Sequence, residues 1–170
     1  LSNDSARNAK FDASNNRFSG TMINEAGANI ILSGNNSYGM KYVANSGDKN
    51  PLISNRGNII LGRNSAGVDK ADTSVGIAVM EDSTISTNVF IGNNHVKNNG
   101  IIEIRDNVNE SIGMYLNIKG GNNLINDTDG KILLSGTGNN NSGMRADIGI
   151  INPTNDNNPA GTAVVINRGI

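Results

Sequence analysis

The chain has 170 residues, 36% hydrophobic, 17% charged and 4% aromatic, with a formal net charge of -1. This size suits one domain, and the near-neutral charge gives no reason to expect nucleic acid or an anionic membrane as a partner. The lack of cysteine excludes disulfides and thiolate metal sites, and the single His95 excludes any site that needs two histidines. No apolar stretch approaches the length of a transmembrane helix, and we expect no signal peptide, cofactor or metal within these residues.

Asparagine and glycine dominate the composition, with 32 and 21 residues, whereas the helix-favouring residues Leu, Glu and Ala are scarce. A polar composition of this kind is compatible with disorder. The isoleucines, however, recur in a regular pattern. The sequence therefore predicts an ordered fold built from strands and turns.

Three short patterns repeat in the same order along the chain, and each repeat predicts three strands. The first pattern is apolar, at Met22-Ile23, Leu52-Ile53, Val96 and Leu124-Ile125. The second follows a turn glycine (Gly27, Gly57, Gly100 or Gly130), at Asn29–Leu32, Asn58–Leu61, Ile101–Ile104 and Lys131–Leu134. The third pairs a glycine with an apolar residue, at Ser37–Met40, Ser74–Ile77, Ser111–Met114 and Asn141–Met144. A fifth repeat begins at Val164.

Within the second and third patterns, apolar residues alternate with a period of two, which is typical of strands with one buried face. One buried column is predicted to contain Ile30, Ile59, Ile102 and Ile132. The neighbouring column carries Glu103 and is therefore expected to face solvent. The spacing between the isoleucines varies from 29 to 43 residues, which is typical of loops that leave a regular core and return to it.

These patterns predict an all-β fold, namely a parallel β-helix of about five coils with three short strands per coil and loop excursions, over residues 1–170. Each coil pairs with the next about 4.8 Å along the axis, so that like residues stack. An asparagine precedes each turn glycine, and we expect a ladder of these at the bend. Its members are Asn24, Asn55, Asn98, Asn126 and Asn167. The rival architecture is a β-sandwich with two-residue hairpin turns, which only Asn99-Gly100 resembles.

The repeated phrases Gly-x-Ile-x-Leu and Ser-x-Gly-Met-x-Tyr/Leu resemble the passenger regions of type V autotransporters. They occur within residues 27–43, 57–80, 100–118 and 130–146, about half of the chain. The resemblance is greatest to the large Asn-rich outer-membrane adhesins of fusobacteria and looser to the vacuolating-cytotoxin family. It implies a right-handed β-helix exported through an outer-membrane barrel and displayed on the cell surface for adhesion and virulence. It also implies a glycan or protein receptor on a host cell or partner bacterium.

The signal peptide and C-terminal barrel of that family are not found in these residues. We therefore expect one segment of a longer passenger, with membrane contact only through that barrel. The lack of cysteine agrees with export, because a periplasmic disulfide hinders threading. The fourth repeat departs from the pattern, since Asn141 replaces a serine and Ala146 a larger apolar residue. We expect its third strand to be looser.

Two further functions are alternatives to adhesion, a carbohydrate-active β-helix enzyme and a spacer without a ligand. A glycosidase needs two carboxyl groups about 5 to 10 Å apart. No outward column contains two acidic residues, and Glu103 is expected to pair with Arg105. We therefore expect no enzymatic activity. Asp127–Gly130 resembles part of an EF-hand loop but lacks its first and last ligands, so a turn is predicted there.

A binding site is expected in a loop excursion, because function on a rigid scaffold tends to lie in loops. The four predicted excursions are residues 44–51, 68–74, 81–94 and 149–163. The last is the richest in polar side chains and contains two prolines. Its amides are suited to hydrogen bonds with sugar hydroxyls. The predicted binding residues are Asn152, Thr154, Asn155, Asp156 and Asn157.

Overall fold

The regular structure of the protein is entirely β-strand in the part that the computed structural model describes. That part comprises residues 10–12, 17–19, 21–44, 51–62, 71–81, 96–118, 123–135, 137–147 and 164–170. Over these ranges, no helix is long and apolar enough to cross a membrane. His95 and most of the four predicted excursions fall outside them.

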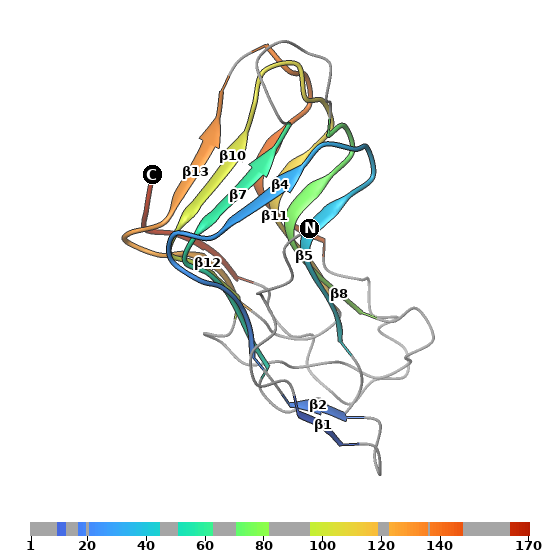
Figure 1. Cartoon of the computed structure of the whole chain (residues 1–170), viewed down its shortest axis with the longest axis vertical. Helices are drawn as coiled ribbons and strands as arrows, with labels where there is room; N and C mark the ends of the chain where they lie inside the picture. The colour runs from blue at the N-terminus through green and yellow to red at the C-terminus, as the bar shows by residue number, and fades with distance from the viewer. Residues whose placement is uncertain are drawn as a thin grey trace, which may run out of the picture.

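The chain winds in coils of three strands, and the strand order is the same in every coil (Figure 1). Coil 1 contains β3 (Thr21–Asn24), β4 (Asn29–Leu32) and β5 (Tyr38–Ala44). Coil 2 contains β6 (Leu52–Asn55), β7 (Asn58–Leu61) and β8 (Val75–Glu81). Coil 3 contains β9 (Val96–Asn98), β10 (Ile101–Ile104) and β11 (Ile112–Asn117). Coil 4 contains β12 (Asn123–Asn126), β13 (Lys131–Leu134) and β14 (Ser142–Asp147), and β15 (Val164–Asn167) starts a fifth coil.

Equivalent strands of successive coils pair in parallel and build three sheets. Sheet 1 has the order β3-β6-β9-β12-β15, sheet 2 the order β4-β7-β10-β13 and sheet 3 the order β5-β8-β11-β14. Figure 1 shows sheet 2 as four strands side by side. The predicted parallel β-helix is confirmed, since a sandwich requires antiparallel neighbours. Among the described strands, antiparallel pairing is confined to β1 (Lys10–Asp12) and β2 (Arg17–Ser19), which precede coil 1.

The pairing register stacks the columns that the sequence predicts. In sheet 2 the stacked isoleucines are Ile30, Ile59, Ile102 and Ile132. In sheet 3 the corresponding column is Met40, Ile77, Met114 and Met144. The fourth repeat keeps this register, because Leu116 pairs with Ala146 two residues after the methionines. The departures at Asn141 and Ala146 thus leave the register unchanged, and the looser third strand stays a prediction.

Glycine is required at one inward position of sheet 3. A Cβ atom on Gly76 would lie 2.6 Å from the carbonyl oxygen of Gly113 and 3.1 Å from Cγ2 of Ile102. The same crowding applies at Gly113, whereas a Cβ atom on Gly143 in coil 4 would meet nothing closer than 3.4 Å. The repeated glycine thus allows sheet 3 to approach the isoleucines of sheet 2.

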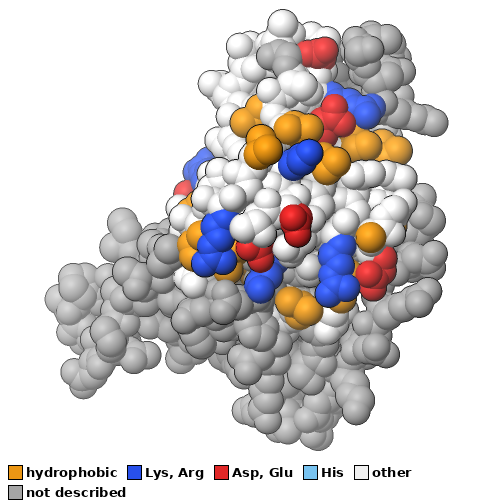
Figure 2. All heavy atoms as spheres, turned by 90° about the vertical axis from the view of Figure 1, so that its left-hand side faces the viewer, with side chains coloured by type: hydrophobic (Ala, Val, Ile, Leu, Met, Phe, Trp, Pro, Cys, Tyr) orange, Lys and Arg blue, Asp and Glu red, His pale blue; other side chains and the backbone are white. Residues whose placement is uncertain are grey.

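The inward side chains form one core along the axis, but its two ends differ in burial. Met40 in coil 1 is only 2% exposed, whereas Leu134 in coil 4 is 52% exposed. Figure 2 looks onto the coil 4 end, where hydrophobic side chains lie among charged ones at the surface. The inward side chains are thus more buried in coil 1 than in coil 4.

Candidate functional site

The predicted binding residues Asn152, Thr154, Asn155, Asp156 and Asn157 lie outside the described residues, so their role stays a prediction. The polar chemistry of the described coils lies elsewhere. It is found at the corner between sheets 1 and 2 (the first corner), at the corner between sheets 2 and 3 (the second corner), and on the outer faces of sheets 2 and 3.

The first corner contains the predicted ladder of five asparagines, which is confirmed. Each Nδ2 donates to Oδ1 of the asparagine in the next coil, over 2.8, 2.7, 2.7 and 2.8 Å from Asn24 to Asn167. The amide of Asn55 also donates to the Ile101 carbonyl (3.3 Å), and Asn126 donates to the Gly130 carbonyl (3.2 Å). The inner members are fully buried. Because their amides are satisfied within the stack, the ladder fixes the register of the coils.

The second corner contains a polar ladder that the sequence reasoning missed. The backbone N–H of Ser74 donates to Ser111 Oγ (3.0 Å), and that of Ser111 donates to Asn141 Oδ1 (2.9 Å). In return, Ser111 Oγ donates to the Ala71 carbonyl (2.8 Å) and Asn141 Nδ2 to the Val108 carbonyl (2.6 Å). Asn141 therefore performs both functions of the serine that it replaces. This is why the fourth repeat stays in register.

A second set of side chains closes the same corner, two residues before each of these serines. Asn35 Oδ1 accepts from the Asp72 N–H (3.0 Å), and Asp72 Oδ1 accepts from the Asn109 N–H (2.7 Å). The residue that follows has a positive φ in every coil, at Asn36, Thr73, Glu110 and Asn140. The signal that reveals this corner is an Asn or Asp two residues before the Ser or Asn of each third pattern.

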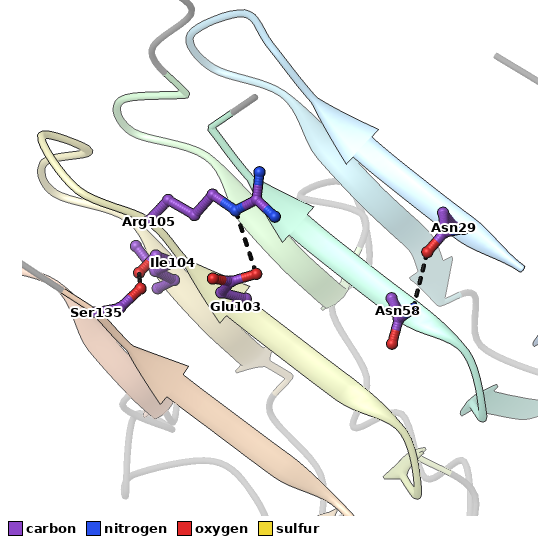
Figure 3. Close-up of polar contacts among 6 residues, drawn as sticks. All are labelled: Asn29, Asn58, Glu103, Ile104, Arg105 and Ser135. Carbon is purple, nitrogen blue, oxygen red and sulfur yellow. Dashed lines mark hydrogen bonds and ion pairs between the residues drawn. The ribbon is translucent and has the colours of Figure 1, made fainter. Parts of the chain in front are cut away.

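The outer face of sheet 2 carries the predicted ion pair of Glu103 and Arg105, with 3.2 Å between Oε2 and Nε (Figure 3). Figure 3 also shows Asn58 Nδ2 donating to Asn29 Oδ1 (2.8 Å) on the same sheet. Ile31 is exposed on this face (47%). The outer face of sheet 2 therefore combines an ion pair and stacked asparagines with an exposed isoleucine.

The outer face of sheet 3 carries a compact cluster that joins coil 3 to coil 4. The Tyr115 hydroxyl donates to Asp147 Oδ2 (2.9 Å), and Arg145 Nε donates to Asp147 Oδ1 (3.0 Å). The arginine lies over the tyrosine ring, with Cζ 5.8 Å from the centroid. The hydrogen bond from Arg145, with help from Tyr115, lowers the pKa of Asp147. Burial and the bond to Asp147 raise the pKa of Tyr115.

Coil 1 contains a groove of about 290 Å³ at the second corner. Its walls combine the apolar side chains of Ile31 and Tyr38 with the hydroxyls of Ser33 and Ser37; Leu32 and Gly34 complete the lining. Lys41 lies beside it, with Nζ 4.4 Å from the Tyr38 ring centroid. The groove therefore offers an aromatic surface and hydroxyl groups, and a positive charge lies against the ring of one of its lining residues.

Asp127–Gly130 forms the predicted turn, which the Gly130 N–H closes by donating to the Asp127 carbonyl (2.8 Å). Asp127 Oδ1 accepts from the Thr128 N–H and lies 3.6 Å from Arg168 Nη1. The bond from Thr128 lowers the pKa of Asp127. Over the described ranges, no group of three His, Cys, Asp or Glu side chains is placed to hold a metal ion.

Comparison with known proteins found no family model, no curated protein and no solved structure that matches this chain. What the structure shows is the fold, a parallel β-helix with stacked asparagines.

Proposed function

We propose that the chain is a scaffold segment of a surface-displayed adhesin of the autotransporter type. In this proposal, a β-helical stalk holds binding loops away from the outer membrane and catalyses no reaction. The observation that carries it is the in-register stacking of coils through polar ladders at both described corners. Hydrogen bonds that cross every coil boundary stiffen a one-dimensional stack.

The arrangement of connections supports the same proposal. At the first corner, consecutive strands are joined by residues 25–28, 56–57, 99–100 and 127–130. The connections from sheet 3 back to sheet 1 are residues 45–51, 82–95, 118–122 and 148–163. Length variation in these last connections leaves the register of the described strands unchanged. Connections of different length and composition therefore join the same two sheets in successive coils, which suits the display of several contact segments.

The test of surface display uses intact cells that produce the natural protein. Antibodies against the folded chain are expected to label unpermeabilised cells, and external protease is expected to remove the signal. A periplasmic protein assayed in parallel controls for cell integrity. Labelling that requires permeabilised cells would contradict the proposal.

Adhesion and a purely mechanical spacer are separated by a glycan and host-receptor array. The purified chain is compared with a variant that lacks residues 152–159. Specific binding that the deletion abolishes supports a loop-borne adhesive site. A folded chain that binds nothing on the array supports a spacer and contradicts adhesion by this segment.

A further inference from the structure

The groove of coil 1 exists because one side chain is missing from a column at the second corner. The members of this column are the residues whose carbonyl groups accept a hydrogen bond from the corner side chain of the next coil, namely Gly34, Ala71 and Val108. Ser74 Oγ donates to the Gly34 carbonyl, Ser111 Oγ donates to the Ala71 carbonyl, and Asn141 Nδ2 donates to the Val108 carbonyl. Ala71 and Val108 are buried in the core, with exposures of 0% and 1%. At Gly34 there is no side chain, and the groove lies there instead.

The backbone does not require glycine at this position. A Cβ atom on Gly34 would have Ser37 Oγ as its nearest neighbour, at 3.7 Å, and the backbone is not left-handed there. Gly138, at the same position of coil 4, is different, because its Cβ atom would collide with the Val108 carbonyl oxygen. A side chain therefore fits at Gly34, and the vacancy in coil 1 is a property of the sequence.

The lining of the groove matches the two kinds of surface on a sugar ring. Tyr38 (39% exposed) and Ile31 offer apolar contacts for C–H groups. Ser33 and Ser37 supply hydroxyls, which both donate and accept hydrogen bonds. The volume lies at the lower limit for small-molecule sites, so it is suited to one sugar ring.

Lys41 adds a positive charge to this lining. Among the described residues its ammonium contacts only the Tyr38 ring, and no described carboxylate lies within ion-pair distance. The comparable pair in coils 3 and 4 is already neutralised, because Asp147 lies 2.9 Å from Nη2 of Arg145. Within the described ranges, coil 1 thus holds a cation that has an aromatic ring beside it and no carboxylate partner, which favours an anionic ligand.

We propose that this groove is a binding site for a single carboxylate-bearing sugar residue. The ring packs against Tyr38 and Ile31, its hydroxyls bond to Ser33 and Ser37, and its carboxylate pairs with Lys41. This site is separate from the loop at residues 152–159. The groove is tested with purified chain, whereas surface display is tested on intact cells. A failure of either test therefore leaves the other proposal standing.

The test titrates the purified chain with glucuronic acid and, in parallel, with glucose, which has the same ring without the carboxylate. Binding is followed by calorimetry and by NMR shifts of the Gly34 and Tyr38 amides. Gly34→Val places in coil 1 the side chain that coil 3 has at Val108, so it fills the groove. Lys41→Met removes the charge, and Arg145→Met removes the other ring-stacked cation as a matched control.

We expect glucuronic acid to bind the native chain about tenfold more tightly than glucose, as one charge-assisted hydrogen bond predicts. Gly34→Val should abolish binding of both sugars while the chain stays folded by circular dichroism. Lys41→Met should reduce the affinity for glucuronic acid to the affinity for glucose. Arg145→Met should change neither affinity. Equal binding by the native chain and Gly34→Val would overturn the site. Equal affinity of the native chain for both sugars would overturn the assignment of an acidic ligand, and a lack of shifts at millimolar glucuronic acid would overturn the proposal as a whole.

Discussion

Coils 1 and 4 have the same three strands and stack in the same columns, yet their cores differ in exposure. Leu32 is 5% exposed in coil 1, whereas its counterpart Leu134 is 52% exposed in coil 4. The size of the side chain in one column of sheet 3 changes in parallel with this difference. The column contains Tyr42 in coil 1, Val79 in coil 2, Leu116 in coil 3 and Ala146 in coil 4. The largest side chain of the column stands in the more buried coil and the smallest in the more exposed one. This contrast predicts that the size of the side chain in this column contributes to the burial of coil 1.

The largest effect is expected inside the asparagine ladder, where coils have a neighbour on both sides. Asn98→Leu would leave Asn126 Oδ1 buried without its donor and would leave Asn55 Nδ2 with the Ile101 carbonyl alone as acceptor. One unsatisfied buried oxygen, together with the lost bonds from Asn98 to the carbonyls of Gly100 and Lys131, predicts a loss of about 3 kcal/mol in the free energy of unfolding. Urea denaturation measures it. Asn167→Leu, at the exposed end of the ladder, is the control, with an expected loss below about 1 kcal/mol. Equal losses at both positions would show that the ladder does not depend on burial.

The second largest effect on stability is expected from Tyr42, a buried side chain of coil 1. Tyr42→Ala removes the side chain that distinguishes coil 1 from coil 4, and the expected loss is about 3 kcal/mol from the cavity and the lost apolar contact. It should also expose Met40, so that its reactivity toward a mild oxidant approaches that of Met144. Val43→Ala, which changes an exposed neighbour, should alter stability by less than about 0.5 kcal/mol. If Met40 stays protected from the oxidant in Tyr42→Ala, groups other than Tyr42 shield it.

A smaller contrast is expected at the inward glycines of sheet 3. In Gly113→Ala the new Cβ atom would lie 2.6 Å from the Gly143 carbonyl oxygen, so the strands must separate, at a cost of about 2 kcal/mol. In Gly143→Ala the new Cβ atom would meet Ile132 Cγ2 at 3.4 Å and Leu134 Cδ1 at 3.8 Å, so the change should be nearly neutral. Urea midpoints of the two variants make the comparison. A large loss in Gly143→Ala would mean that coil 4 is packed as tightly as the inner coils.

The columns and the asparagine ladder could be predicted from the sequence because in a parallel stack like residues lie on like residues. Alternation with a period of two then identifies the inward set, and an asparagine recurring before a glycine identifies the bend. The second corner was missed because its residue with positive φ changes identity. Thr73 and Glu110 occupy that conformation, which neither residue type favours. The recurring signal of this corner is instead the Asn or Asp that precedes the residue with positive φ, and its meaning follows from the side-chain bonds to the backbone of the next coil.

The groove could not be predicted for a different physical reason, since it depends on an atom that is absent. Gly34, Ala71 and Val108 each stand three residues before a serine, so the alignment itself was available in the sequence. Their shared position became meaningful only once Ala71 and Val108 proved to be buried at the corner. Strand columns can be extrapolated from repeat to repeat, but a cavity arises where one repeat departs from the others.

The smallest effect is expected from pH at the surface cluster that joins coil 4 to coil 3. The pKa of Asp147 is lowered in the folded state from an ordinary value of 3.8, chiefly by the hydrogen bond from Arg145. A lowered pKa contributes stability above the unfolded value, and this contribution is lost as the pH falls through the folded value. The contribution is small because the pair is largely solvated, with side-chain exposures of 56% and 39%.

Urea midpoints of the native chain and of Asp147→Asn, measured between about pH 6 and pH 2, test this contribution. The native chain should be slightly more stable at pH 6, and the difference should vanish at the acid end, where the carboxyl group is protonated in both states. A difference that stays constant with pH would assign the effect to packing of the side chain. Added salt should reduce the difference at pH 6, because screening weakens an exposed ion pair but leaves the buried ladders unchanged.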